Sequence, residues 1–332
     1  MKFCVFGAGA IGGYLAVELA LARHEVCVIA RGAHLQAIRE HGLKLRIRGT
    51  EKMVRVAASD RPADFGKQDY ILCTLKTHQA YAAAGSFASL LGPDTAVVTA
   101  MNGIPWWYFY RHGGSLEGRH LQSVDPGGRQ WQQIGPERAI GAVVDPACTL
   151  VAPGVVAHEE FNRFTLGEPD GSRSARVLAL SEALQGAQLD APVRDELRWN
   201  IWLKLWGNVC FNPISALTGA TLDHMTSDPG LRSLCLTMMR EASAVNEALG
   251  IHIPVAMMQR RLDAAGQVRG HRMSMLQDLE RGRSLEIDAI VTVVHELGQL
   301  TGVATPAIDV VLALIQDRAR AAGLYRPVHE VE

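Results

Sequence analysis

The first twenty residues hold the feature that most constrains the fold, a G-x-G-x-x-G motif between two contrasting segments. Residues 2–6 form an apolar run typical of a short strand, and residues 13–20 favour a helix. In this context the first glycine permits a tight turn, the second lets the backbone approach a pyrophosphate, and the third lets helix and strand pack closely. The pyrophosphate would bind the free N–H groups that begin the helix. The residues predicted to bind a dinucleotide are Gly7, Ala8, Gly9, Ala10, Ile11 and Gly12. The alternative is a glycine-rich turn without a ligand.

The end of the second expected strand bears on the choice of cofactor. Residues 25–30 read as this strand, and Arg31 follows it. An NAD site usually has an acidic residue about 20 positions beyond the glycines, where it binds the ribose 2′-hydroxyl. Arg31 carries the opposite charge and suits a 2′-phosphate. We therefore predict NADPH, the alternative being that Arg31 is an ordinary surface residue.

Composition bounds the class of protein. The chain has 332 residues and a net charge of −1, which supports neither nucleic acid nor an anionic membrane surface as a partner. No apolar run approaches the ~18 residues of a transmembrane helix, and we expect no signal peptide. Six cysteines without a C-x-x-C pair indicate a reduced, cytoplasmic protein. The histidines lack metal-ligand spacing, so we predict no metal site. The assembly, for which we consider a homodimer, is not fixed by the sequence.

The first half of the chain alternates strand and helix signals, which predicts a parallel sheet covered on both faces. The expected strands are 2–6, 25–30, 69–74, 95–100, 139–144, 154–158 and 164–166, with a hairpin at 43–48 and 53–57. The expected helices are 10–22, 33–41, 78–91 and 174–187. We predict that residues 1–190 form an α/β, Rossmann-type domain that binds NADP.

The second half of the chain has helical periodicity throughout. The expected helices are 194–216, 228–249, 255–267, 272–300 and 306–322. We predict that residues 191–332 form an all-helical domain for substrate and catalysis. Its ligand is expected near the carboxyl ends of the sheet strands.

A polar stripe marks the first of these helices. Lys204, Asn208 and Asn212 are spaced i, i+4 and i+8, so they share one face of an otherwise apolar helix. A buried polar stripe is unfavourable without partners, which suggests a polar ligand. The alternative is that Lys204 extends to water and the two asparagines cap nearby backbone.

Two further segments complete a pattern. Asn102-Gly103 follows the end of an expected strand, and residues 273–288 contain S-M-x-Q-D followed by E-I-D. Together with the glycine motif, Leu75-Lys76 and K-x-x-x-N-x-x-x-N, this ordered set resembles the ketopantoate reductase (2-dehydropantoate 2-reductase) family over nearly the whole chain.

The resemblance implies the NADPH-dependent reduction of a 2-oxo acid to a 2-hydroxy acid, foremost 2-dehydropantoate (ketopantoate) to pantoate in pantothenate biosynthesis. It makes Lys204 the residue that polarises the ketone and donates a proton, and Glu286 the partner of the substrate hydroxyl. The residues it implies for substrate are Asn208, Asn212, Ser274 and Asn102, the last also beside the nicotinamide; those it implies for the cofactor are Lys76 and Arg31. The alternatives are a reductase of a bulkier 2-oxo acid and a non-catalytic NADP-binding sensor.

Two features leave questions for the structure. Ser274 and Glu286 would lie about 120° apart on a straight helix, so we expect a bend at Gly282. The aromatic run Trp106 to Tyr110 departs from the family pattern. Three readings of it stay open: a substrate lid, extra core, and a subunit contact.

Overall fold

The computed structural model describes residues 1–331, and the chain divides into two compact units. Unit 1 comprises residues 1–101, 105–120 and 128–197. Unit 2 comprises residues 102–104 and 121–127 together with the chain from Arg198 onward. Two short segments of unit 2 therefore lie, in the sequence, between segments of unit 1. The domain boundary expected at residue 190 stays a prediction.

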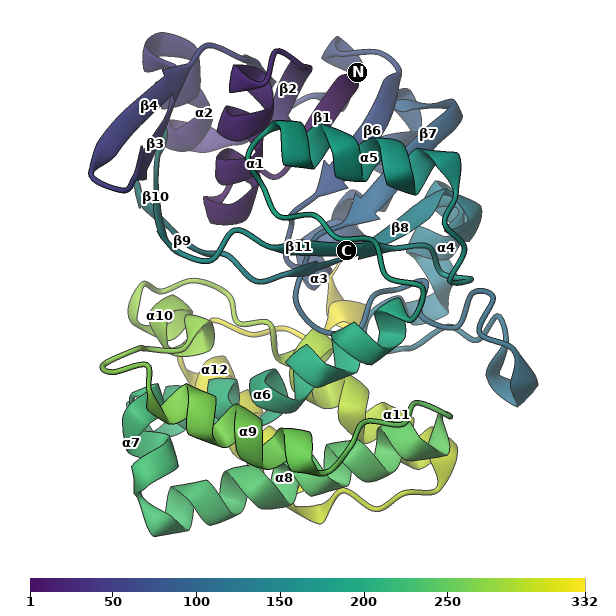
Figure 1. Ribbon diagram of the computed structural model, residues 1–332, viewed down its shortest axis with the longest axis vertical. Coiled ribbons are helices and arrows are strands. Elements are labelled where there is room, and N and C mark those ends of the chain that lie inside the picture. Colours follow the sequence, from purple (N-terminus) through teal and green to yellow (C-terminus); the bar gives the residue numbers. More distant parts are fainter. Residues whose placement is uncertain (332) are drawn as a thin grey trace. The chain divides into compact units, whose positions relative to one another are not determined.

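Unit 1 is built on a seven-stranded sheet of order β11-β8-β7-β6-β1-β2-β5 (Figure 1). Its strands are β1 (Lys2–Phe6), β2 (Glu25–Ile29), β5 (Ala57–Ser59), β6 (Gln68–Cys73), β7 (Leu91–Thr99), β8 (Ala139–Val144) and β11 (Phe164–Gly167). All neighbours pair in parallel except β11, which is antiparallel to β8. The predicted Rossmann-type α/β class is confirmed.

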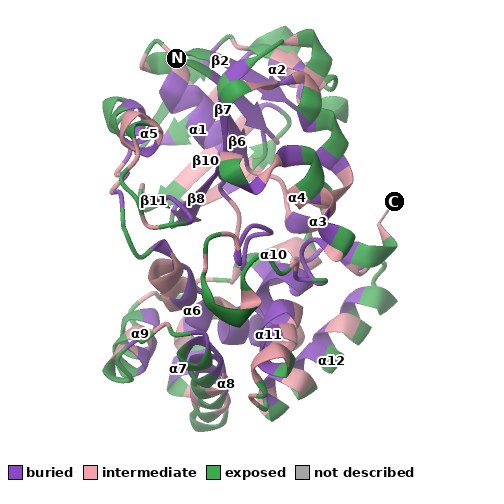
Figure 2. Cartoon of the chain, turned by 90° about the vertical axis from the view of Figure 1, so that its right-hand side faces the viewer, coloured by how far each residue is buried: buried purple, intermediate pink, exposed green. Residues whose placement is uncertain are grey.

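Helices cover both faces of this sheet. They are α1 (Ala10–Leu21), α2 (Gly32–His41), α3 (Thr77–Ala83), α4 (Arg129–Ile134) and α5 (Ala175–Gly186). In Figure 2, α5 lies on one side of the sheet, and α3 and α4 lie on the other. Helix α1 is buried almost all round, because a second sheet also packs against it. This explains why its sequence is apolar apart from Glu18, whose carboxylate accepts from Lys52 Nζ at 2.7 Å.

The second sheet has four strands in the order β4-β3-β10-β9. They are β3 (Leu43–Ile47), β4 (Thr50–Val54), β9 (Ala147–Ala152) and β10 (Val155–Glu160). A hairpin forms as predicted, but its second strand is Thr50–Val54 and not 53–57, because the chain already turns at Arg48-Gly49, where both residues have positive φ (49° and 73°). Strands β5 and β9 were not predicted.

The described part of unit 2 is helical, as predicted. Its helices are α6 (Leu197–Thr218), α7 (Leu222–Ser227), α8 (Pro229–Ala248), α9 (Ala256–Gly266), α10 (Ser274–Glu280), α11 (Val293–Thr301) and α12 (Pro306–Ala321). The prediction of one bent helix over 272–300 is wrong. Helix α10 ends before Gly282, whose φ of 63° terminates it, and residues 283–286 are not helical. A π-helical turn (Asp288–Thr292) then leads into α11.

The aromatic run packs inside unit 1. Trp106, Trp107, Tyr108 and Phe109 are each at most 3% exposed. The Trp107 Nε1–H group donates to Thr99 Oγ1 of β7 at 2.9 Å. On β8, a Cβ atom at Gly141 would lie 2.6 Å from the Trp107 ring, so glycine makes room for the indole. These contacts favour the core interpretation over the lid.

Two features are absent from residues 1–331. No helix in this range combines the length and the apolar character needed to cross a membrane. The same range contains no group of three or more His, Cys, Asp or Glu side chains placed to hold a metal ion.

Candidate active site

The glycine-rich loop has the geometry that its motif predicts. Gly7 has a φ of 107°, which permits the turn from β1 into α1. A Cβ atom at Gly12 would lie 2.1 Å from the Gly7 carbonyl oxygen and 2.9 Å from the Val5 side chain. A Cβ at Gly9 would meet nothing within 4 Å, so this side of the loop is open. The first N–H groups of α1 have no partner within the helix. The loop thus fits a pyrophosphate.

His34, on α2, supports the glycine loop. The sequence did not predict this role. The Gly154 N–H donates to His34 Nδ1 at 2.8 Å, so in the neutral ring the proton is on Nε2. That Nε2–H donates to the Ala8 carbonyl oxygen at 2.5 Å. Burial lowers the pKa of His34, and the bond to Ala8 offsets part of this effect. A neutral imidazole therefore joins the loop to the turn between β9 and β10.

The other predicted cofactor residues lie at the same edge of the sheet. Phe6, the last residue of β1, pairs with Ile29 of β2 and Cys73 of β6, so the three parallel strands end together. Arg31 follows β2 as the exposed N-cap of α2, and Lys76 follows β6 as the N-cap of α3. The structure thus gathers both cations and the glycine loop at one edge.

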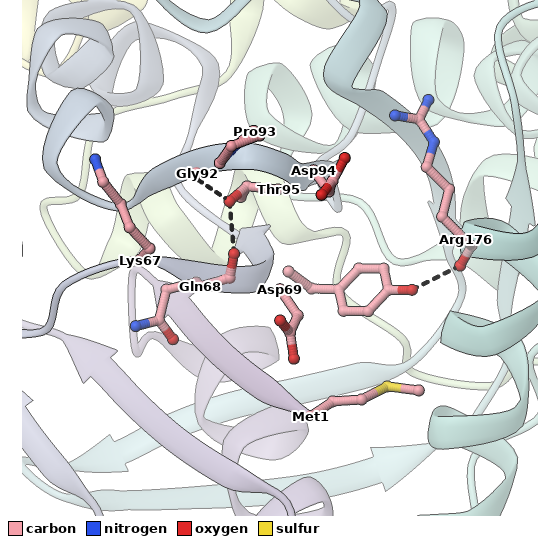
Figure 3. Close-up of a pocket in the computed structure, with 10 residues that line it drawn as sticks. Met1, Lys67, Gln68, Asp69, Gly92, Pro93, Asp94, Thr95 and Arg176 are labelled. Atoms are coloured by element: carbon pink, nitrogen blue, oxygen red, sulfur yellow. Dashed lines mark hydrogen bonds between the residues drawn. The ribbon is translucent and has the colours of Figure 1, made fainter.

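A cavity of about 470 Å³ lies at the opposite edge of this sheet (Figure 3). Its lining includes Met1, Lys67, Asp69, Asp94 and Arg176, near the amino ends of β6 and β7. Its polar groups serve the fold: Tyr70 donates to the Arg176 carbonyl oxygen at 2.8 Å, and the Arg176 guanidinium binds the Glu168 carboxylate at 2.7 Å. This cavity is therefore separate from the glycine loop.

Within unit 2, three of the predicted site residues form a connected polar group. Lys204 Nζ donates to Asn102 Oδ1 at 2.9 Å, and Asn102 Nδ2 donates to Glu286 Oε2 at 3.4 Å. The three residues are far apart in the sequence. All three side chains are half-buried. An ammonium, an amide and a carboxylate are thus joined in one row, which we call the polar row.

Gly103 explains how Asn102 reaches this position. Its φ is 83°, and a Cβ atom there would lie 1.9 Å from the Ala289 carbonyl oxygen. The next residue, Ile104, donates its N–H to that same oxygen at 3.0 Å. Only glycine allows this close approach to the π-helical turn. The N-G pair therefore fixes Asn102 against the segment that follows Glu286.

Asn212 and Ser274 form a second pair in unit 2. Asn212 Oδ1 accepts from Ser274 Oγ at 3.1 Å and from the Met275 N–H at 3.3 Å. Asn212 is 1% exposed, so its amide serves chiefly to hold the start of α10. Asn208 is half-buried on α6, one turn from Lys204 and one turn from Asn212. The substrate roles of these residues stay predictions.

The rest of α6 is anchored by contacts that the sequence did not reveal. Trp202 and Trp206 are fully buried, and Trp206 Nε1 donates to Asn246 Oδ1 at 2.9 Å. Arg261 Nη2 donates to the Lys204 carbonyl oxygen at 3.3 Å. A Cβ atom at Gly207 would lie 2.8 Å from Arg261 Nε, so this glycine admits the guanidinium. These contacts fix the backbone that carries Lys204.

Chemically, the polar row supplies what a carbonyl reduction needs. An ammonium group stabilises the oxyanion that forms when hydride reaches a ketone, and it can donate the proton that neutralises it. A carboxylate accepts a hydrogen bond from a substrate hydroxyl. The amide between them orients both groups.

Comparison with known proteins agrees with these features. Residues 3–171 match the family "Ketopantoate reductase PanE/ApbA", and residues 196–319 match "Ketopantoate reductase PanE/ApbA C terminal". The chain is 53% identical to a 2-dehydropantoate 2-reductase of Mesorhizobium japonicum, over 98% of this chain and 100% of the relative.

Solved structures give the same result. A Ralstonia solanacearum MolK2 protein, provisionally assigned as a ketopantoate reductase, superposes with a TM-score of 0.93 at 41% identity, covering 98% of this chain and 99% of its own. A D-mandelate dehydrogenase, at 22% identity and a TM-score of 0.86 over 98% of this chain and 100% of its own, shares the fold. The sequence-based resemblance is confirmed, and the chain belongs to the ketopantoate reductase PanE/ApbA family.

Proposed function

We propose that this protein is a 2-dehydropantoate 2-reductase, which reduces ketopantoate to pantoate with NADPH. The observation that carries the proposal is the polar row of Lys204, Asn102 and Glu286, in a chain that also has an intact dinucleotide loop. The 53% identical relative bears this enzyme name.

In the proposed reaction each residue of the polar row has one task. A nicotinamide cofactor, when bound, supplies the hydride for the carbonyl carbon. The Lys204 ammonium polarises the carbonyl oxygen and transfers a proton to it, so that the ketone becomes a hydroxyl and Lys204 regains its proton from solvent. Glu286 accepts a hydrogen bond from the hydroxyl that ketopantoate already carries. Asn102 keeps the ammonium and the carboxylate apart and correctly aimed.

The choice of NADPH over NADH is part of this proposal and depends on Arg31. An exposed guanidinium two positions after the end of β2 favours a 2′-phosphate. Lys76 offers a second cation at the same edge of the sheet. We further propose that residues 1–190 bind the cofactor and residues 191–332 supply substrate binding and catalysis. Cytoplasmic location and homodimer assembly also stay proposals.

The test is a comparison of substrates under one set of conditions. NADPH oxidation is followed with the purified protein and a panel of 2-oxo acids, including ketopantoate and bulkier compounds. We expect the highest kcat/KM with ketopantoate. A higher value with a bulkier acid supports the alternative reductase, and tight NADPH binding without turnover of any acid supports the sensor.

A further inference from the structure

The C-terminal tail, residues 322–331, holds the backbone on both sides of Glu286. On one side, the Leu285 N–H donates to the Leu324 carbonyl oxygen at 3.0 Å. On the other side, the Asp288 carboxylate accepts from the Tyr325 hydroxyl at 2.6 Å and from the Val328 N–H at 3.0 Å. The carboxylate assigned to the substrate hydroxyl thus lies in a short span that is fastened to the tail at both ends.

The span around Glu286 is irregular, and besides its bonds to the tail its Arg283 N–H donates to the Asp278 carbonyl oxygen at 2.8 Å. Residues 283–286 lie between the end of α10 and the π-helical turn, and they form no helix or strand. A side chain on such a span is directed by the bonds at its two ends. Leu285 and Asp288 supply those bonds, and both are buried, at 2% and 6% exposure.

Asp288 is the centre of a closed hydrogen-bond network. Besides the two tail groups, it accepts from Thr292 Oγ1 at 2.9 Å. Gln316 of α12 donates to the Tyr325 hydroxyl at 3.1 Å. A buried carboxylate that accepts three hydrogen bonds holds its neighbours in place, and loss of one donor weakens the network. The tail is therefore fixed in one arrangement relative to the π-helical turn.

The same turn also carries the contact to Asn102. The Ala289 carbonyl oxygen accepts from the Ile104 N–H at 3.0 Å, and Asn102 in turn donates to Glu286 at 3.4 Å. The turn therefore adjoins Asn102 as well as the span that carries Glu286. The tail is connected to the reaction through this turn.

We propose that the C-terminal tail is a clamp that aims Glu286, with Asp288 and Tyr325 as positioning residues that set recognition of the substrate hydroxyl. The inference rests on the proposed function. It adds a specificity role for residues that contact neither substrate nor cofactor.

The test uses Tyr325→Phe, which removes one hydroxyl and keeps the ring. We expect kcat/KM for ketopantoate to fall about tenfold, mainly through KM, because the hydrogen bond from the substrate hydroxyl to Glu286 is misaligned. The deoxy analogue, which lacks that hydroxyl, should be reduced at an unchanged kcat/KM. Gln316→Met, which removes the donor to the Tyr325 hydroxyl and to Thr292 Oγ1 but leaves both bonds to Asp288, should give a smaller effect of the same kind.

A double variant shows whether the effect passes through Glu286. In a Glu286→Gln background, Tyr325→Phe should cause no further loss with ketopantoate. Tyr70→Phe is the matched control, because Tyr70 is also buried and its hydroxyl donates one hydrogen bond, to a backbone carbonyl in unit 1. It should leave the ratio of the two substrates unchanged.

The outcomes separate the two proposals. Equal losses on both substrates, additive losses in the double variant, or no change in Tyr325→Phe would overturn the clamp. Failure of the unmodified protein to reduce ketopantoate would instead overturn the proposed function, and this result needs no variant.

Discussion

Lys204 donates to the side-chain oxygen of Asn102, an amide that holds the ammonium in place without taking its charge. A carboxylate in that position would form an ion pair and stabilise the ammonium before the reaction. An amide leaves more of the positive charge available to the oxygen that becomes negative during hydride transfer.

Replacing Lys204 tests this role directly. Lys204→Ala should lower kcat by about 10²–10⁴, the range expected when a general acid is lost. The dissociation constant for NADPH, measured by fluorescence titration, should change little, since the glycine loop, Arg31 and Lys76, which we propose bind the dinucleotide, lie in unit 1. Leu203→Ala, at the neighbouring half-buried position of α6, is the control for disturbance of the helix. Near-normal turnover in Lys204→Ala would remove Lys204 from the mechanism.

Arg31 carries the prediction on cofactor choice. A charge-assisted bond to a 2′-phosphate contributes about 1.5–3 kcal/mol, roughly ten- to a hundredfold in affinity. NADPH should therefore bind more tightly than NADH by this factor, and Arg31→Ala should remove most of the difference. Arg39→Ala, on the exposed face of the same helix, should keep it. Equal affinities of the unmodified protein for both cofactors would contradict the assignment.

At the scale of elements, the sequence predicted best those structural features that depend on residues close together in the chain. The glycine loop between β1 and α1 follows from steric demands at Gly7 and Gly12, which are visible in the motif itself. Strand β9 was missed because it is stabilised by pairing with β10, a contact that periodicity does not reveal. The division of 272–300 was missed because one left-handed glycine, Gly282, overrides a continuous helical pattern.

The aromatic run was also beyond prediction, because its environment comes from β7 and β8. Trp107→Ala should lower the free energy of unfolding by about 3–5 kcal/mol, as expected for a fully buried aromatic side chain. Thermal denaturation would measure this loss, and KM per folded molecule should stay unchanged. Phe161→Ala is the control, since Phe161 is 62% exposed and should matter little. A raised KM with unchanged stability would instead support a lid.

At the scale of the whole molecule, acid should destabilise the protein through a half-buried histidine of unit 1. Burial, with a smaller contribution from Lys76, lowers the pKa of His78 to about 4. An unfolded histidine titrates near pH ~6.5, so between these values only the unfolded state takes up the proton. The contribution of neutral His78 to the free energy of unfolding is thus complete above the pKa of the unfolded histidine. It falls by about 1.4 kcal/mol for each pH unit of acidification between the two pKa values.

Thermal denaturation as a function of pH would measure this effect. His78→Gln should flatten the fall in Tm between about pH 6.5 and 4.5, where most carboxyl groups are still ionised. His224→Gln, at an exposed position of unit 2, should leave the slope as it is. An unchanged slope in His78→Gln would show that other groups cause the acid sensitivity.

The sequence predicted a Rossmann-type region and a helical region, but it did not predict to which unit each site residue belongs. Asn102 lies three positions after the end of β7 and was expected at the carboxyl edge of the sheet. The structure assigns residues 102–104 to unit 2, because Gly103 and Ile104 pack against the Ala289 carbonyl oxygen. Such a contact, between residues far apart in the chain, leaves no periodic signal.

This interleaving of the two units has a consequence for how such genes can recombine. A crossover near residue 198 would join one parent's chain from Arg198 onward, with Lys204 and Glu286, to the other parent's Asn102. The polar row of the chimaera would therefore combine residues from both parents. Its Gly103 would have to pack against the π-helical turn of the other parent. Exchange of substrate specificity by a single crossover is thus disfavoured, and residues 102–104 must travel with the helical unit.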